Sequence, residues 1–325
     1  MLTGMLADRR MMALVDRECA VVVPENEMKQ YVVAAHADTL DFVPGDALAD
    51  WATRHGKKLR GHTLLWNRAE YIPRWLSERY ADAPAAALAT WLTGYVGATA
   101  AHFGARIHSW DVVNETVDPA TGALRDTMFN RKLGFDALRL AFTAARERAP
   151  HAQHVYNDYM SWDAGSAKHR AGVLKLLERF RAEAVPVDAL GIQSHIGAEG
   201  DMTTMSERER EWRGFVDLVV AMGYRLLITE FDVSDHSVGG TVSTRDAQVA
   251  AVGKAYLDMM LSYRQLEHLL CWGLVDRYSW LQNFSPRPDQ QPLRPLPYDA
   301  GYGAKPLRAA IAEALKGAPR RASQS

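Results

Sequence analysis

The amino-acid sequence predicts an α/β protein, and two observations carry this prediction. Short, almost continuously apolar runs recur along the chain and alternate with segments that have helical spacing. The polar or aromatic residues that end these runs follow one another at intervals of 37, 53, 42, 36, 37 and 42 residues. One strand–helix unit of a (β/α)8 barrel takes roughly 30 residues, and more with insertions. The sequence therefore favours a (β/α)8 (TIM) barrel.

Seven runs have the character of strands, and their order fits seven consecutive barrel strands. Because they are continuously apolar rather than alternating, they indicate parallel strands that are covered on both faces. The runs are CAVVVPEN, LRGHTLLW, WDVVNE, HVYNDY, ALGIQSH, RLLITEF and HLLCWG. In such a barrel the carboxyl ends of all strands meet at one mouth. No Gly-rich phosphate fingerprint follows any run, which disfavours a doubly wound open sheet.

Helical patterns fill the segments between the runs. Apolar residues at Phe135, Leu138, Phe142 and Ala145 form one stripe, and similar stripes lie within 173–180 and 215–222. The Pro-rich stretch 285–303 predicts a long loop before a last helix, KPLRAAIAEALKG. No low-complexity linker divides the chain. We therefore expect one barrel domain over residues 1–316 and a disordered tail over 317–325.

The composition and charge of the chain disfavour two classes of binding partner. The net charge is −1 and no block of like charges occurs, so neither a nucleic acid nor a membrane surface is expected as a partner. No apolar run reaches the length of a transmembrane helix, and the N-terminal segment lacks the apolar stretch of a signal peptide.

Two carboxylates end strand-like runs that lie three units apart. Glu115 closes WDVVNE and Glu230 closes RLLITE, so both should face the mouth of the barrel. A carboxylate there costs several kcal/mol if it is buried without a partner. Each could be one member of a buried ion pair. A pair of carboxylates across a barrel mouth also suits glycoside hydrolysis, in which one donates a proton and the other attacks the sugar.

WDVVNE and ITEFD resemble the acid/base and nucleophile signatures of the glycoside hydrolase family 10 endo-1,4-β-xylanases. The resemblance spans roughly residues 6–310 and rests on several motifs in order. They include PENEMK (24–29), RGHTLLW (60–66), YNDY (156–159), GIQSH (191–195) and WGLVDRYSWL (272–281). It implies endo-hydrolysis of xylan or xylo-oligosaccharides by a monomer, with no cofactor and no metal. A polymeric substrate would place the protein outside the cell or in the periplasm, although this chain shows no signal peptide.

The resemblance also implies a role for individual residues. Glu115 would be the acid/base and Glu230 the nucleophile of a retaining double displacement, with the carboxylates about 5–5.5 Å apart. Asn114 would bind the 2-hydroxyl of the reacting sugar, and His195, supported by Asp232, would hold Glu230. The expected ligands of glycone hydroxyls are Glu25, Asn26, Lys29, His62 and Gln193. Trp66, Trp272 and Trp280 would form hydrophobic walls, while Tyr156 and Asn157 would contact the leaving group.

Several of these residues have a plainer alternative. His62 and His195 could be hydrogen-bonded core histidines, and Trp272 and Trp280 could belong to barrel packing. Lys29 could merely pair with Glu25, which lies one helical turn earlier. Asp232 could be structural as much as catalytic.

Two departures from the family pattern affect what the resemblance implies. The family has His directly after the Trp of RGHTLLW, whereas here Asn67 follows Trp66 and two extra residues precede Pro73 in WNRAEYIP. This departure changes residues that would line the glycone subsite. Only 24 residues precede Glu25, and the segment 6–19 should form a helix. We therefore expect the first barrel strand to be missing or truncated.

Three other readings of the sequence stay open. The same carboxylate pair would serve a β-glucanase. Carboxylates and histidines at the strand ends could instead hold Mg²⁺ or Mn²⁺ in a metal-dependent sugar isomerase, although no ligand pair has characteristic spacing. The third interpretation is a non-catalytic xylan-binding barrel, which the expected absence of the first strand suggests.

Overall fold

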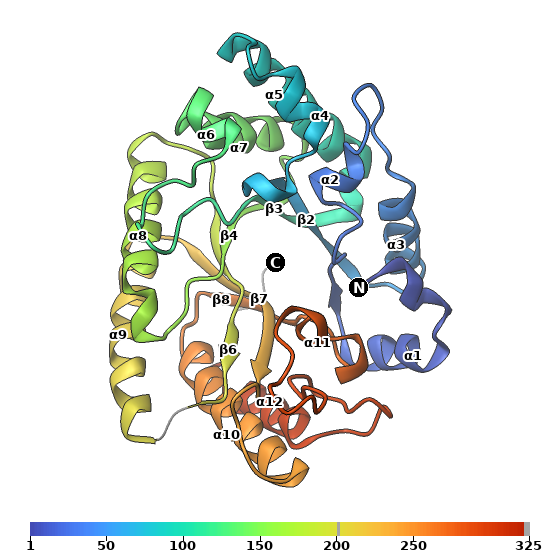
Figure 1. The fold of residues 1–325 in the computed structure, drawn as a ribbon, viewed down its shortest axis with the longest axis vertical. Coiled ribbons are helices and arrows are strands. Elements are labelled where there is room, and N and C mark those ends of the chain that lie inside the picture. Colours follow the sequence, from blue (N-terminus) through green and yellow to red (C-terminus); the bar gives the residue numbers. More distant parts are fainter. Residues whose placement is uncertain (200–201, 322–325) are drawn as a thin grey trace. The chain divides into compact units, whose positions relative to one another are not determined.

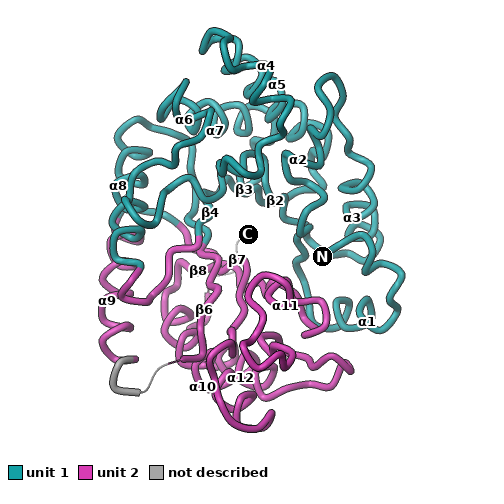
Figure 2. The backbone as a smooth tube through the Cα atoms, viewed as in Figure 1, with its two compact units in different colours: residues 1–158, 166–191, 222–224 teal, residues 159–165, 192–221, 225–325 magenta. Residues whose placement is uncertain are grey.

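The computed structural model describes residues 1–199 and 202–321, in two compact units (Figure 2). Unit 1 comprises residues 1–158, 166–191 and 222–224, and unit 2 comprises 159–165, 192–221 and 225–325. Strand β5 (Ala189–Ile192) passes from the first unit to the second. The described helices contain none long and apolar enough to cross a membrane.

Unit 1 is built on parallel strands in the order β1, β2, β3, β4 (Figure 1). Their bounds are β1 Val21–Val22, β2 Lys58–Trp66, β3 Ile107–Asn114 and β4 Gln153–Asp158. In the register of the sheet, Asn114 lies opposite Trp66 on one side and Asn157 on the other. The carboxyl ends of β2, β3 and β4 therefore share one edge, as the strand-end argument predicts.

Helices lead from each strand of unit 1 to the next, in the predicted strand–helix alternation. The longer ones are α3 (Val43–Arg54), α5 (Ala85–Phe103), α7 (Asp136–Arg148) and α8 (Ala167–Ala182). Shorter helices are α2 (Gln30–Val33), α4 (Arg74–Arg79) and α6 (Met128–Leu133), with 3-10 turns η2 (Ala69–Tyr71) and η3 (Gly104–Arg106). The 3-10 turn η4 (Ala164–Ser166) has residues of both units. The apolar stripes predicted for α7 and α8 are buried.

Unit 2 also contains parallel strands, with β7 paired to both β6 and β8. These are β6 (His195–Gly197), β7 (Arg225–Ser234) and β8 (Leu266–Cys271). Its helices are α9 (Met202–Ala221), α10 (Val242–Leu261), α11 (Leu281–Phe284) and α12 (Pro306–Gly317), with the 3-10 turn η5 (Asp276–Tyr278). The predicted loop 285–303 contains no helix or strand, and α12 is the predicted last helix.

No strand precedes Val21 in the described part of the chain. The N-terminal segment forms a 3-10 turn, η1 (Thr3–Ala7), and the predicted helix, α1 (Arg9–Glu18). Asp8 caps α1 by accepting hydrogen bonds from the backbone N–H of Arg10 and Met11. Met1 lies beside β1, because its amino group donates to the Val23 carbonyl at 2.7 Å and its carbonyl accepts from Glu25 N–H at 2.8 Å.

The predicted disordered tail is only partly described. Residues 322–325 lie outside the described residues. Just before them, the Arg321 guanidinium donates to the Leu266 carbonyl at 2.7 Å and to the Leu261 carbonyl at 3.2 Å.

Close backbone packing in unit 1 depends on Gly172, and this gives a stability prediction. A Cβ at Gly172 would lie 2.4 Å from the carbonyl oxygen of Gly122, a backbone atom, whereas a Cβ at Gly94 in α5 would meet nothing within 4 Å. We expect Gly172→Ala to lower the free energy of unfolding by about 1–3 kcal/mol through overpacking. Gly94→Ala, the matched control, should raise it by about 0.5–1 kcal/mol. Urea denaturation followed by circular dichroism measures both, and shifts of the same sign would contradict this packing.

Candidate active site

The end of β3 places two predicted site residues in a buried hydrogen-bonded cluster of unit 1. Asn114 donates through Nδ2 to Glu115 Oε1 at 3.2 Å and accepts at Oδ1 from Asn157 Nδ2 at 3.0 Å. Glu115 N–H donates to the Asn157 carbonyl at 2.9 Å. All three residues are buried. The structure thus brings Asn114, Glu115 and Asn157 together at the shared strand edge.

The backbone of Glu115 adopts a conformation that is rare for this residue type. Its φ is 54°, in the left-handed region that costs a non-glycine residue about 1–3 kcal/mol. Arg125 Nε donates to the Glu115 carbonyl at 2.7 Å and supports this turn. The Glu115 carboxylate also accepts from Arg68, with Nη1 and Oε2 3.2 Å apart. Neither arginine is predicted by the strand-end argument, because both belong to loops.

His62 belongs to a buried charged group on neighbouring strands. Its Nδ1 lies 2.9 Å from Asp111 Oδ2, and Arg60 donates to the other oxygen of the same carboxylate. The Asp111 charge thus fixes the orientation of the His62 ring. Arg60, His62 and Asp111 are each at most 2% exposed.

Asn67, which directly follows Trp66, is fully buried and is hydrogen-bonded to two other segments of the chain. Its Nδ2 donates to Thr116 Oγ1 at 2.8 Å and to Asn130 Oδ1 at 3.0 Å, while its Oδ1 accepts from Thr127 Oγ1 at 2.8 Å. These bonds use both hydrogens of Nδ2 and one lone pair of Oδ1. Asn67 therefore supports the loops that follow β2 and β3.

The predicted glycone ligands of unit 1 gather around Trp66. Lys29 Nζ lies 4.1 Å from the centre of the Trp66 ring and 3.4 Å from Asn26 Oδ1. Asn26 Oδ1 also accepts from the Tyr31 hydroxyl at 2.7 Å. Glu25 follows β1 and is half-buried.

Tyr156 is directed into the interior of unit 1 rather than toward solvent. It is fully buried and its hydroxyl donates to Asp158. Burial, followed by the neighbouring Asp158 charge, raises the pKa of Tyr156 well above its ordinary value. The Tyr156 hydroxyl is therefore protonated and hydrogen-bonded to Asp158. Its predicted contact with a leaving group stays a prediction.

Unit 2 holds the second group of predicted residues, arranged around His195. His195 Nε2 lies 3.2 Å from Glu230 Oε2, and Nδ1 lies 2.9 Å from Asp232 Oδ2. Trp280 Nε1 donates to the same Asp232 oxygen at 2.9 Å, and its ring centre lies 4.9 Å from that of His195. Strands β6 and β7 set this geometry, because His195 and Asp232 are register partners.

The remaining predicted residues of unit 2 lie beside the same strands. The Gln193 carbonyl accepts from Glu230 N–H at 3.0 Å, and Trp272 N–H donates to the Phe231 carbonyl at 3.0 Å. Both side chains are buried. The structure thus brings Gln193, His195, Glu230, Asp232 and Trp280 into one group.

The charge state of His195 follows from its two carboxylate neighbours. Burial by itself would lower the pKa of His195, but the charge of Asp232 and hydrogen bonds to Asp232 and Glu230 raise it to about 10. At neutral pH the ring is therefore an imidazolium, and both nitrogens donate. A cation that hydrogen-bonds Glu230 favours its carboxylate form.

This pKa gives a prediction for stability against pH. The folded-state pKa is about 10 and the ordinary value is 6.5, so the stabilisation is complete below about pH 6.5 and is lost as pH rises toward 10. We expect the difference in unfolding free energy between wild type and His195→Gln to shrink over this window, by at most about 1.4 kcal/mol per pH unit. Urea denaturation at pH 6, 8 and 10 measures it. A difference that does not change with pH would contradict the imidazolium.

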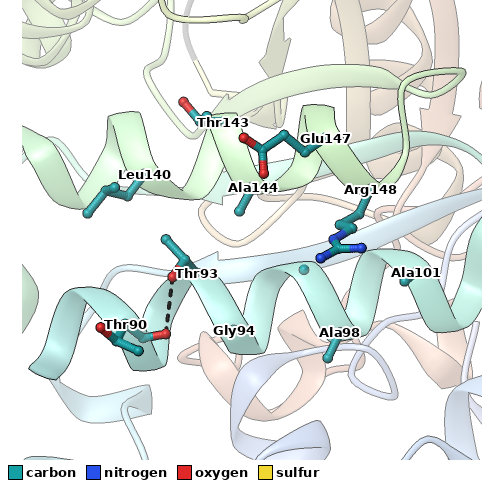
Figure 3. Close-up of a pocket in the computed structure, with 11 residues that line it drawn as sticks. Thr90, Thr93, Gly94, Ala98, Ala101, Leu140, Thr143, Ala144, Glu147 and Arg148 are labelled. Carbon is teal, nitrogen blue, oxygen red and sulfur yellow. Dashed lines mark hydrogen bonds between the residues drawn. The ribbon is translucent and has the colours of Figure 1, made fainter.

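Unit 1 also contains a groove that is lined by other residues. It has a volume of about 670 Å³ and lies between α5 and α7 (Figure 3). Its described lining includes Thr90, Thr93, Leu140, Glu147 and Arg148. None of the residues predicted for the site contributes to it.

Comparison with known proteins assigns the family. The model of glycosyl hydrolase family 10 matches residues 2–314. Endo-1,4-beta-xylanase 3 of Hypocrea jecorina is 28% identical over 314 residues, which cover 96% of this chain and 80% of that protein. Native xylanase 10B of Thermotoga maritima superposes with a TM-score of 0.85 at 27% identity, over 97% of this chain and 92% of that one.

A further solved structure carries a ligand. Xylanase 10B of Thermotoga petrophila, in complex with xylobiose, has a TM-score of 0.85 and 26% identity, over 95% of this chain and 89% of that one. These likenesses confirm the predicted (β/α)8 barrel class. Since the family model spans almost the whole sequence, the chain belongs to glycosyl hydrolase family 10, a family of retaining glycosidases, and is a glycoside hydrolase.

Proposed function

We propose that this protein is an endo-1,4-β-xylanase that hydrolyses xylan and xylo-oligosaccharides with retention of anomeric configuration. Family membership supports the reaction class. The observation that carries the proposal is the protonated His195 between Glu230 and Asp232, with a pKa raised to about 10. It provides an ionised, oriented carboxylate at Glu230, which a glycosidase nucleophile requires.

In the first step, Glu230 attacks the anomeric carbon and a glycosyl–enzyme ester forms. Glu115, protonated, donates its proton to the glycosidic oxygen, so that the leaving sugar departs as a neutral alcohol. His195 keeps one Glu230 oxygen hydrogen-bonded while the other forms the bond. Asn114 hydrogen-bonds the 2-hydroxyl of the reacting sugar, an interaction that strengthens as charge develops in the transition state.

In the second step, water hydrolyses the ester. Glu115, now ionised, removes a proton from the attacking water, and Glu230 leaves as a carboxylate. Two inversions at one carbon give net retention. Arg68 donates through Nη1 to Glu115 Oε2 at 3.2 Å and so helps to hold this side chain in position for both steps.

The other predicted residues are proposed to bind the substrate. Glu25, Asn26, Lys29, His62 and Gln193 bind glycone hydroxyls, Trp66, Trp272 and Trp280 form apolar walls, and Tyr156 and Asn157 lie toward the leaving group. We further propose that residues 1–316 form the catalytic barrel and that the protein acts as a monomer without a cofactor.

Assays on polymeric substrates test this proposal. We expect reducing sugars to be released from xylan, and viscosity to fall faster than reducing ends appear, because cleavage is internal. Activity on β-1,4-glucan should be lower, and chelation should leave the rate unchanged. Release only from glucan would support a glucanase, loss on chelation a metal-dependent enzyme, and binding without cleavage a non-catalytic barrel. Each of these three outcomes contradicts the proposal.

A further inference from the structure

Three aromatic rings of unit 1 form a cluster that we call the Tyr71 cluster: Tyr31, Trp66 and Tyr71. Tyr71 lies parallel to Trp66, with ring centres 3.7 Å apart and planes 9° apart. Tyr31 is tilted against both, at 6.3 Å from Trp66 and 6.1 Å from Tyr71. Such pairs stabilise one another beyond the area they bury. The cluster is therefore a preformed unit.

Both faces of the Trp66 ring are covered. Tyr71 occupies one face at 3.7 Å, and Lys29 Nζ lies 4.1 Å from the ring centre. A parallel ring at that distance leaves no room on its own side for an ammonium group, so Lys29 lies over the opposite face. Trp66 therefore presents an edge, and not a face, to a sugar.

Tyr71 is the member of the cluster that is exposed to solvent. It is 36% exposed, although one side of its ring is stacked on Trp66. It lies in η2, within the WNRAEYIP segment that follows β2. This segment thus brings an aromatic ring over Trp66.

Arg68 connects this ring to the proposed acid/base. The guanidinium carbon of Arg68 lies 5.7 Å from the centre of the Tyr71 ring, near the limit of a cation–π contact. Its Nη1 donates to Glu115 Oε2 at 3.2 Å, and Nη2 donates to Glu70. Tyr71 is therefore within the length of one arginine side chain of the Glu115 carboxylate.

We propose that Tyr71 is a sugar-binding residue. A xylosyl unit of the glycone, beyond the unit that reacts, stacks on the exposed part of the Tyr71 ring that the Arg68 guanidinium, 5.7 Å from the ring centre, leaves open. The apolar C–H face of a pyranose matches an aromatic ring, and the ring costs little entropy to order because Trp66 and Tyr31 already hold it. Asn26 and Lys29, proposed ligands of glycone hydroxyls, contact the same cluster, which places the stacked sugar on the glycone side. This inference rests on the proposed function.

Aryl β-glycosides of xylose, xylobiose and xylotriose test the assignment. The readout is the ratio of kcat/KM on the trioside to kcat/KM on the monoside. We expect Tyr71→Ala to lower this ratio about tenfold, through KM. Tyr71→Phe, which keeps the ring, should restore it. Tyr80→Ala, at the end of α4, removes a half-buried tyrosine outside the cluster and should leave the ratio at the wild-type value.

Two results would overturn the inference. An equal loss on all three glycosides would mean that Tyr71→Ala acts by disturbing Arg68 and Glu115. An unchanged ratio would mean that no sugar stacks there. Xylopentaose binding to Glu230→Gln, with and without Tyr71→Ala, separates the inference from the proposed function. Weaker binding in the double variant supports the stacking role even if the wild type does not cleave xylan, and equal binding contradicts it.

Discussion

Glu230→Ala should abolish xylan hydrolysis, with kcat reduced by about 10⁴-fold or more, since no glycosyl–enzyme ester can form. The cavity left by the carboxylate gives this variant a diagnostic property. With an aryl xylobioside that has a good leaving group, added azide should enter this cavity, attack the anomeric carbon and restore turnover. The product should be the α-glycosyl azide, because only one inversion occurs.

Rate measurements on xylan and NMR of the azide adduct check this prediction. Glu147→Ala, which removes an exposed carboxylate from α7, is the matched control and should retain the wild-type rate. Wild-type activity in Glu230→Ala, or a β-azide product, would refute the assignment of Glu230 as the nucleophile.

Glu115→Ala should show a loss that depends on the leaving group. Without the acid, xylan hydrolysis should fall by about 10²–10⁴-fold, the usual contribution of general acid catalysis. An aryl glycoside whose leaving group needs no proton should form the glycosyl–enzyme ester at nearly the wild-type rate, and then accumulate it because the base is missing. Azide should speed the second step and give the β-glycosyl azide.

Pre-steady-state bursts of the released phenol measure this accumulation. The opposite anomers of the azide products distinguish the two carboxylates in a single experiment. Equal losses on xylan and on the activated glycoside would contradict the role of Glu115 as acid/base.

Strand positions and strand-end residues could be predicted because they depend on local pattern and simple geometry. The continuous apolar run before Asn114 marks a strand that is buried on both faces, and parallel register then places Asn114 beside Asn157. By contrast, the buried face of α10 begins with Arg245 and Asp246, whose burial depends on ion pairs with Asp235 and Arg294. A search for apolar periodicity could not mark these two polar residues as buried.

The loop residues of the site could not be predicted, since their positions depend on tertiary contacts. Asn67 is held by Thr116, Thr127 and Asn130, which are remote from it in sequence. Arg68 could have been suspected only from the unusual WNRAEYIP segment. The left-handed backbone of Glu115 also has no signal in the sequence, because glutamate rarely adopts it.

The stereochemistry of the first-formed product tests the central claim most directly. Xylohexaose is hydrolysed at high enzyme concentration, and ¹H NMR spectra record the anomeric protons before mutarotation is complete. Double displacement through Glu230 predicts that the new reducing end appears first as the β-anomer, with the α-anomer following at the rate of mutarotation. Initial appearance of the α-anomer would show single displacement and contradict the account.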